Sequence, residues 1–408
     1  MAVMNNKRHI IVFALITALC LIGDSMLYIV LPVHYRDMGL SSLWEVGIVL
    51  SVNRIVRLPL NPCIGWFYSR VSERAGLYIA AALAVTTTFS YGFLPNLAFW
   101  VLARCVWGAA WSLLRLGSLF CILKISTPID RGHHTGLYNG LYRLGNLVGM
   151  FLGGLLADMI GVRSTVTLFS MVTALSVFLV TFYIPKGMAQ QDGRAESGMS
   201  LRDSLAITLR DKKIFLLMLT GCCMALIIQG VVASTLSELI SVHTKGGIPL
   251  WGAVIGASTL AGFFQALRWG WEPLLAPFVG RVSDRRIGRS RMLRHTVGLG
   301  ALFFALLAAP LPLPLWFPCL LVMQLVSTTL TTVSDAAASD AAAADGGRAL
   351  LMSYALLVDV GAALGPLFAY AMNEFFGINA VYCCCAALFA LLFLQWRPQG
   401  TAFGRKEM

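Results

Sequence analysis

Ionisable side chains lie inside long apolar runs of this chain, where a charge must be either neutralised or put to use. Asp24 lies in the first run, Arg54 in the second and Arg104 in the fourth. A charged side chain at the centre of a bilayer costs roughly 3 kcal/mol or more. We therefore treat these residues as candidates for proton transfer or for ligand binding.

The depths of these three residues place them in one layer. At 1.5 Å per helical residue, Asp24 lies ~12 Å from the outer end of its run and Arg104 lies ~10 Å from the same surface. Arg54 reaches a similar depth on a run that travels in the opposite direction. A carboxylic acid beside arginine can gain and lose a proton as its surroundings change. Asp24 is the acid that we expect to do this.

Further arginines extend the layer into a column in the first half of the chain. Arg57 follows Arg54 by three residues and shares its helical face. Arg115 lies eleven residues beyond Arg104, and Arg143 in the fifth run falls at a similar depth to Arg115. We add Asn139 as a candidate ligand contact. An excess of arginine in such a layer suits an anionic or carboxylate-bearing ligand.

The second half carries a different set of candidates, which are Arg268, Trp269, Glu272 and Asp359. Arg268 precedes Glu272 by four residues, so the two can pair, either for function or simply to hold helices together. Trp269 can line a cavity or pack in a core, and the sequence does not separate these two roles.

The elements that must position these residues follow from composition. Hydrophobic residues make up 58% of the chain and charged residues 12%, against about 25% charged in soluble domains. A bilayer accepts this much apolar surface, and its spans must be helices because lipid offers backbone groups no partner. Twelve runs are long enough to cross it: 10–32, 44–67, 75–94, 97–123, 135–159, 164–185, 213–241, 249–279, 292–309, 313–338, 350–374 and 378–396.

A repeat divides these runs into two sets of six. The segment 60–65 is echoed by 275–280, an offset of 215, and Gly145-x-x-x-Gly149 is echoed by Gly361-x-x-x-Gly365, an offset of 216. A constant offset indicates that one unit has been duplicated. The predicted fold is an all-α membrane protein with twelve transmembrane helices in two pseudo-symmetric six-helix bundles. The bundles are 1–186 and 213–408, joined by a cytoplasmic linker at 187–212, and a ligand site is expected between them.

Basic residues predict the orientation. Of the 31 lysines and arginines, just Arg36, Arg163 and Lys245 fall in the loops that face away from the N-terminus. The positive-inside rule then puts both termini in the cytoplasm and the protein in the plasma (inner) membrane. The net charge of +12 is explained by this topology, so we expect no nucleic-acid partner. The ten cysteines show no metal or disulfide spacing, and we expect no cofactor and no bound metal.

The loop that begins at Gly280 carries a motif that resembles one known family. It reads Gly280-Arg-Val-Ser-Asp284-Arg285-Arg-Ile-Gly-Arg and looks like the G-x-x-x-D-R-x-G-R-[KR] loop of the major facilitator superfamily, with one residue inserted. The first-half copy begins at Gly65 and includes Arg70, but it has Ser69 where the family has aspartate. Gly280 is expected to allow close helix contact, and Asp284 to act as a gate at a helix end.

Three helices carry further motifs of the same family. Arg104-x-x-x-Gly108 resembles a helix-4 motif that is frequent in proton-coupled members. Gly145-x-x-x-Gly149-Met-x-x-Gly153 resembles the helix-5 signature of exporting antiporters, with methionine in place of proline. Helix 11 keeps Gly361-x-x-x-Gly365-Pro366. Small residues four apart also let helices pack closely in lipid, so close packing is the competing explanation.

The resemblance implies a secondary active transporter that works by alternating access and exports a small molecule in exchange for protons. Asp24 and Arg104 would couple transport to the proton, and the arginine column favours an anionic or amphiphilic substrate such as a siderophore-like metabolite or a drug. We expect a monomer in the lipid bilayer and no enzymatic activity. Two alternatives stay open: a polytopic membrane protein that binds or flips lipids, and a non-transporting sensor or membrane enzyme.

Overall fold

The computed structural model describes residues 2–126, 131–184, 211–245, 247–250, 253–283, 288–342 and 347–396. The predicted linker lies almost wholly outside this range, and so do Asp284 and Arg285. Contacts divide the chain into two compact units. The first unit is Met1–Arg194 with Ser234–Trp269, and the second is Ala195–Ala233 with Gly270–Met408. Each unit is described by itself below.

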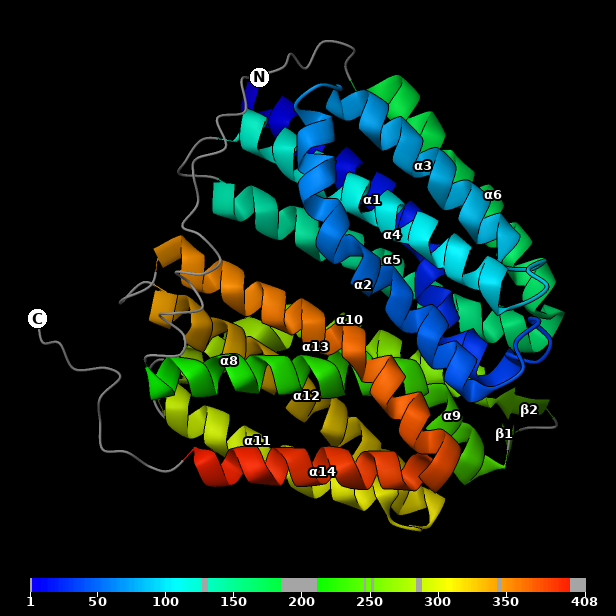
Figure 1. Ribbon diagram of the computed structural model, residues 1–408, viewed down its shortest axis with the longest axis vertical. Helices are drawn as coiled ribbons and strands as arrows, with labels where there is room; N and C mark the ends of the chain where they lie inside the picture. The colour runs from blue at the N-terminus through cyan, green and yellow to red at the C-terminus, as the bar shows by residue number, and fades with distance from the viewer. Residues whose placement is uncertain are drawn as a thin grey trace, which may run out of the picture. The chain divides into compact units, whose positions relative to one another are not determined.

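Six long helices open the first unit (Figure 1). They are α1 Ala2–His34, α2 Leu43–Tyr68, α3 Glu73–Ser90, α4 Leu97–Ile125, α5 Arg131–Ile160 and α6 Val162–Tyr183. Short polar side chains define where several of them begin. Ser42 caps α2 by accepting from the Glu45 amide, and Glu45 accepts in return from the Ser41 amide at 2.6 Å. Asn96 caps α4 in the same way. Such caps satisfy amides that have no partner within the helix.

The next span is one continuous helix with an irregular centre. It runs through α8 Lys212–Met224, the π-helical segment η1 Ala225–Val232 and α9 Ala233–Thr244. A hairpin of β1 Gly247–Leu250 and β2 Ala253–Gly256 follows, and then α10 Ala257–Val282. The prediction of a helix from residue 249 is therefore wrong at residues 249–250 and 253–256, which are strands. Pro249 and the β-branched pair Val254 and Ile255, with glycine on both sides, favour a hairpin over a helix.

Four helices complete the second unit: α11 Arg289–Ala308, α12 Leu313–Ala341, α13 Gly347–Phe376 and α14 Ile378–Gln395. The twelve predicted spans therefore correspond to helices of the structure, which confirms the predicted fold class. Within the described part of the chain, nine helices are long and apolar enough to cross a membrane by length and composition alone. Large apolar side chains on their surfaces, such as Phe182 at 68% and Phe375 at 81% exposure, fit contact with lipid.

Glycines set the distance between α5 and α1. A Cβ at Gly145 would lie 2.3 Å from the Ala18 carbonyl oxygen, and one at Gly149 would lie 2.5 Å from the Ile22 carbonyl oxygen. Gly153 is similarly tight, because its Cβ would lie 2.4 Å from Met26 Cγ. The small-residue motif on α5 thus brings two backbones into contact, and it holds α1, which carries Asp24, against α5, which carries Arg143.

The repeat of this motif does the same in the second unit. A Cβ at Gly361 would lie 2.2 Å from the Cys222 carbonyl oxygen, and one at Gly365 would lie 2.4 Å from Gly230 Cα. Pro366 follows inside α13. The first glycines of the two loop motifs, Gly65 and Gly280, lie inside α2 and α10 and behave differently, because a Cβ there would meet no described heavy atom within 4 Å. The close helix contact predicted at Gly280 is therefore not seen among the described residues.

Candidate functional site

Asp24 and Arg104 form a buried ion pair between α1 and α4. Arg104 Nη1 lies 2.5 Å from Asp24 Oδ1. Asp24 is 6% exposed and Arg104 is 0% exposed. Arg104 Nε also donates to the Val49 carbonyl oxygen on α2 at 3.1 Å. Because Arg104 on α4 bonds to both α1 and α2, the ion pair links three helices.

Polar neighbours surround this pair. Arg104 Nη1 donates to the Tyr91 hydroxyl at 3.3 Å, and the Tyr91 ring stacks on Trp100 with centroids 5.2 Å apart. On the other side, Asn53 Nδ2 lies 3.5 Å from Asp24 Oδ1. Arg104 Nη2 and Asn53 Oδ1 are buried with no hydrogen-bond partner among the described residues. The Asp24 carboxylate can accept from Arg104 Nη2, whereas Asn53 Oδ1 is an acceptor and can bond Asp24 only when Asp24 carries a proton.

Arg54 and Arg57 on α2 both lie beside aromatic rings. Arg54 Nε donates to the Tyr28 hydroxyl at 3.4 Å. The Arg57 guanidinium lies 5.3 Å from the centre of the Trp111 ring, and its Nε atom is buried without a hydrogen-bond partner among the described residues. Aromatic rings stabilise a guanidinium without satisfying its N–H groups in the plane. The Nε group of Arg57 is thus available to an anion.

The aromatic wall beside Arg57 continues onto α5. Trp111 packs edge-on against Tyr142 with centroids 5.8 Å apart, and Tyr142 lies 5.2 Å from Tyr138. The Tyr138 hydroxyl lies 3.2 Å from Thr17 Oγ1. The sequence analysis did not predict this wall. The i, i+4 spacing of the two tyrosines is the signal that could have found it.

A third cluster joins α5 to the first half of α10. The guanidinium groups of Arg143 and Arg268 each lie 5.5 Å from the centre of the Trp269 ring. Trp269 Nε1 is buried without an acceptor among the described residues, and so is Nε2 of Gln265, which is 1% exposed. Both Gln265 and Arg268 are on α10, three residues apart. The predicted residues Arg143, Arg268 and Trp269 are therefore brought together.

The remaining predicted residues are more scattered. Arg115 on α4 is exposed and Asn139 on α5 is half-buried. Glu272 and Asp359 belong to the second unit, where Glu272 is half-buried and Asp359 is exposed. In the same unit the Tyr354 hydroxyl donates to Asp335 Oδ1 at 3.0 Å, a contact that sequence reasoning missed.

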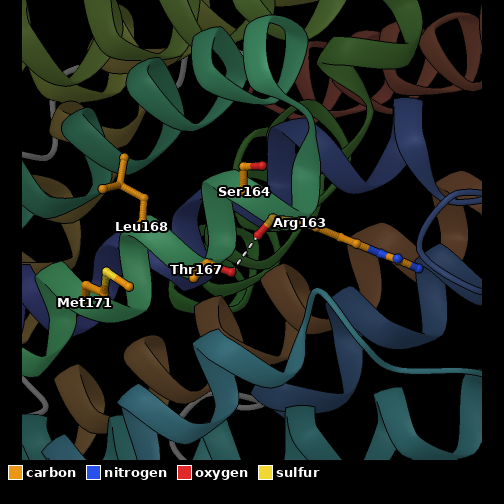
Figure 2. A pocket seen from close by; sticks show the side chains of 5 residues that line it. All are labelled: Arg163, Ser164, Thr167, Leu168 and Met171. Carbon is orange, nitrogen blue, oxygen red and sulfur yellow. Dashed lines mark hydrogen bonds between the residues drawn. The ribbon is translucent and has the colours of Figure 1, made fainter.

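A groove on the surface of α6 is separate from all of these clusters. Figure 2 shows its lining residues, which are Arg163, Ser164, Thr167, Leu168 and Met171. They all come from one helix, and the Thr167 hydroxyl is already bonded to the Arg163 carbonyl oxygen at 2.8 Å. Leu168 and Met171 are 42% and 64% exposed. This groove has the character of a lipid-facing surface, and the buried clusters remain the better candidates.

Comparisons with known proteins agree with the helical fold. The family model of the Major Facilitator Superfamily matches residues 9–271. The chain belongs to the Major Facilitator Superfamily. It is therefore a multi-pass membrane transporter, as the resemblance of its loop and helix motifs predicts.

Several relatives align over most of the chain. The chain is 22% identical to the multidrug resistance protein MdtG of Proteus mirabilis (strain HI4320) over 393 residues, which cover 92% of this chain and 91% of that protein. It is 23% identical to MdtG of Escherichia coli O17:K52:H18 (strain UMN026 / ExPEC) over 391 residues, which cover 93% and 91%. Among solved structures, the nucleoside transporter NupG superposes with a TM-score of 0.77 at 14% identity, covering 96% of this chain and 98% of that one. This last likeness establishes the fold alone.

Proposed function

We propose that this protein is a secondary active transporter that exchanges protons for a small organic molecule by alternating access. The buried contact between Asp24 and Arg104 carries this proposal. A carboxylate in a membrane span is costly unless it is paired or protonated, so Asp24 has two stable conditions. It is charged when Arg104 holds it, and it is neutral when it binds a proton and Arg104 turns away.

These two conditions allow coupling between the proton and the conformation. The ion pair joins α1, α2 and α4, so loss of the Asp24–Arg104 contact changes the packing of three helices at once. A ligand or a proton shifts a conformational equilibrium by the difference in its affinity for the two states. Protonation of Asp24 favours the state in which Arg104 no longer reaches it.

The proposed direction is export. The α5 motif resembles that of exporting antiporters. Its glycines bring α5 against α1, since a Cβ at Gly145 would lie 2.3 Å from the Ala18 carbonyl oxygen and one at Gly149 would lie 2.5 Å from the Ile22 carbonyl oxygen. The aligned relatives are named as multidrug resistance proteins, which fits an outward direction for this chain. In this proposal the protein exports a small molecule across the inner membrane. It works as a monomer, and both of its termini lie in the cytoplasm.

The proposed substrate is anionic or amphiphilic. Arg57 supports this choice because its guanidinium rests on Trp111 and its Nε has no partner among the described residues. The rings of Trp111, Tyr142 and Tyr138 offer an apolar wall beside that cation. A compound with a carboxylate and an aromatic body matches both features.

The coupling proposal is tested in liposomes that contain the purified protein. With an imposed pH gradient, the wild type should accumulate its substrate, identified beforehand by a thermal-shift screen of anionic, neutral and cationic aromatic compounds. Asp24→Asn should abolish this accumulation while substrate binding survives. Asp37→Asn is the matched control, because Asp37 is an exposed carboxylate near the end of the same helix. Accumulation at the wild-type rate in Asp24→Asn would remove Asp24 from the coupling role.

A further inference from the structure

One contact at the end of the first unit was not expected from the sequence. Asp158, near the end of α5, accepts two hydrogen bonds through Oδ2 from Thr259 at the start of α10. The amide nitrogen lies 2.9 Å away and the hydroxyl oxygen 2.7 Å away. His34, the last residue of α1, places Nε2 3.5 Å from the other carboxylate oxygen, Oδ1. We call His34, Asp158 and Thr259 the outer clasp.

Asp158 acts as the N-terminal cap of α10 although it belongs to another helix. The first amides of a helix have no partner within the helix, and the amide of Thr259, the third residue of α10, is one of them. A carboxylate at this position also meets the positive end of the helix dipole. The residue before the helix is Gly256, whose Cβ would lie 2.2 Å from Asp158 Oδ2. The local sequence therefore leaves room for a cap supplied by α5.

The two helices remain in backbone contact below the clasp. A Cβ at Gly154 would lie 2.3 Å from the Ser258 carbonyl oxygen, and a Cβ at Gly262 would lie 2.4 Å from the Met150 carbonyl oxygen. Met150, Gly154 and Asp158 are spaced four apart, so they lie on one face of α5. This face is sealed against the start of α10 for two turns, and the clasp closes its end.

We propose that the outer clasp holds the outer end of the transport pathway closed and must release Thr259 in each transport cycle. The reason is that α5 lies in the first predicted six-helix bundle and α10 lies in the second, and alternating access requires the bundles to separate at each end in turn. This end of the pathway is the outer one if the proposed orientation holds, so the inference rests on the proposed function. Asp158 is a positioning residue, since it acts through the start of α10 and not on the substrate.

The test measures how easily a reagent reaches the sealed face from outside. Met150→Cys is the reporter, because Met150 is 6% exposed and lies two turns below Asp158. The exposed native cysteines among the described residues, Cys63 and Cys383, are replaced by alanine, and the same background without the reporter gives the blank. A membrane-impermeant maleimide is added to intact cells, and the modification rate of the reporter is measured.

Asp158→Asn should raise this rate about tenfold, which is the size of effect expected when a charge-assisted hydrogen bond is lost. Thr259→Val keeps the shape and the amide but removes the hydroxyl donor, so it should raise the rate about threefold. The double variant should fall below the product of the two single effects, because both remove the same bond. Asp37→Asn is the control: it lies 3.7 Å from His34 Nδ1 and should leave the rate unchanged.

Three outcomes overturn the proposal. They are an unchanged rate in Asp158→Asn, an equal rise in Asp37→Asn, and a lowered thermal midpoint in Thr259→Val without a change in rate, which is the result expected of a purely structural cap. If Asp158→Asn fails to fold, Thr259→Val still decides the matter. None of these measurements involves transport, so failure of the clasp leaves the Asp24 experiment intact.

Discussion

Arg104 and Arg57 are two arginines of the first unit, one buried and one half-buried, whose charges are stabilised in different ways. Arg104 has the Asp24 carboxylate 2.5 Å away. Arg57 has the Trp111 ring centre 5.3 Å away and no acceptor for its buried Nε among the described residues. A carboxylate neutralises a guanidinium, whereas a ring does so only in part. The difference is that Arg104 already has a carboxylate partner in the protein, whereas Arg57 has an N–H group that the proposed substrate would use.

Removal of Arg104 should have the largest effect on stability. Arg104→Ala leaves the Asp24 carboxylate buried without its cation, and removal of one partner of a buried pair costs about 3–5 kcal/mol. We expect a large fall in the thermal midpoint of the detergent-solubilised protein. Arg57→Ala removes no partner from a buried acid and serves as the matched control, with a much smaller fall.

A second variant sharpens the same test. Asp24→Asn in the Arg104→Ala background removes the stranded charge, so the double variant should recover part of the lost stability. Equal thermal midpoints for Arg104→Ala and Arg57→Ala, with no recovery in the double variant, would contradict the assignment of Arg104 to Asp24.

Ligand binding, unlike stability, should depend strongly on Arg57. Arg57→Ala should weaken the binding of anionic aromatic compounds by roughly tenfold to a hundredfold, because a charge-assisted hydrogen bond to the ligand is lost. Arg57→Lys keeps the charge but loses the planar fork, so its loss should be intermediate. Ligand-induced shifts of the thermal midpoint with an anionic, a neutral and a cationic panel measure this. Tight cationic ligands whose binding ignores Arg57→Ala would show that the substrate is not an anion.

The sequence placed some of this site and missed the rest for identifiable reasons. Depth along the helices put Asp24 and Arg104 in one layer, and the structure joins them, because rise per residue is fixed in a helix. The ring under Arg57 could not be found this way, since Trp111 is 54 positions away along the chain and its orientation depends on packing. Asp158 was missed because it falls at a span end, where a charge normally meets water.

Helix packing and the hairpin likewise include features that the sequence predicts and features that it does not. The motif glycines on α5 predict close contact with a neighbouring helix, and Gly145 and Gly149 make it with α1. At Gly280 no such contact occurs among the described residues, since a glycine permits a close approach without requiring one. The strand residues 249–250 and 253–256 fall in a run predicted to be helical because it is apolar, and hydropathy does not distinguish the two backbones when the run is short.

Removal of the ring beneath Arg57 should have a moderate effect. Trp111→Leu keeps the site apolar but deletes the cation–π contact, which is worth about 0.5–2 kcal/mol. Without the ring the guanidinium is held less firmly, so we expect anion binding to weaken about threefold to tenfold in the thermal-shift assay. Trp107→Leu is unsuitable as a control because Trp107 is fully buried in the core. Trp66→Leu serves instead, since Trp66 is 60% exposed, and it should leave binding unchanged.

The smallest expected effect is at the edge of the Asp24–Arg104 pair. Tyr91→Phe deletes the hydroxyl that accepts from Arg104 Nη1 at 3.3 Å, which is a long and weak hydrogen bond. The ring remains stacked on Trp100 at 5.2 Å and remains within 6.0 Å of the guanidinium, so the position of Arg104 is kept by Asp24 and the Val49 carbonyl. We expect the free energy of unfolding to fall by no more than about 1 kcal/mol, with a correspondingly small fall in the thermal midpoint. The rate of pH-driven accumulation should change less than about threefold. A loss of accumulation as large as that of Asp24→Asn would mean that Tyr91, and not the carboxylate alone, holds Arg104 in its coupling position.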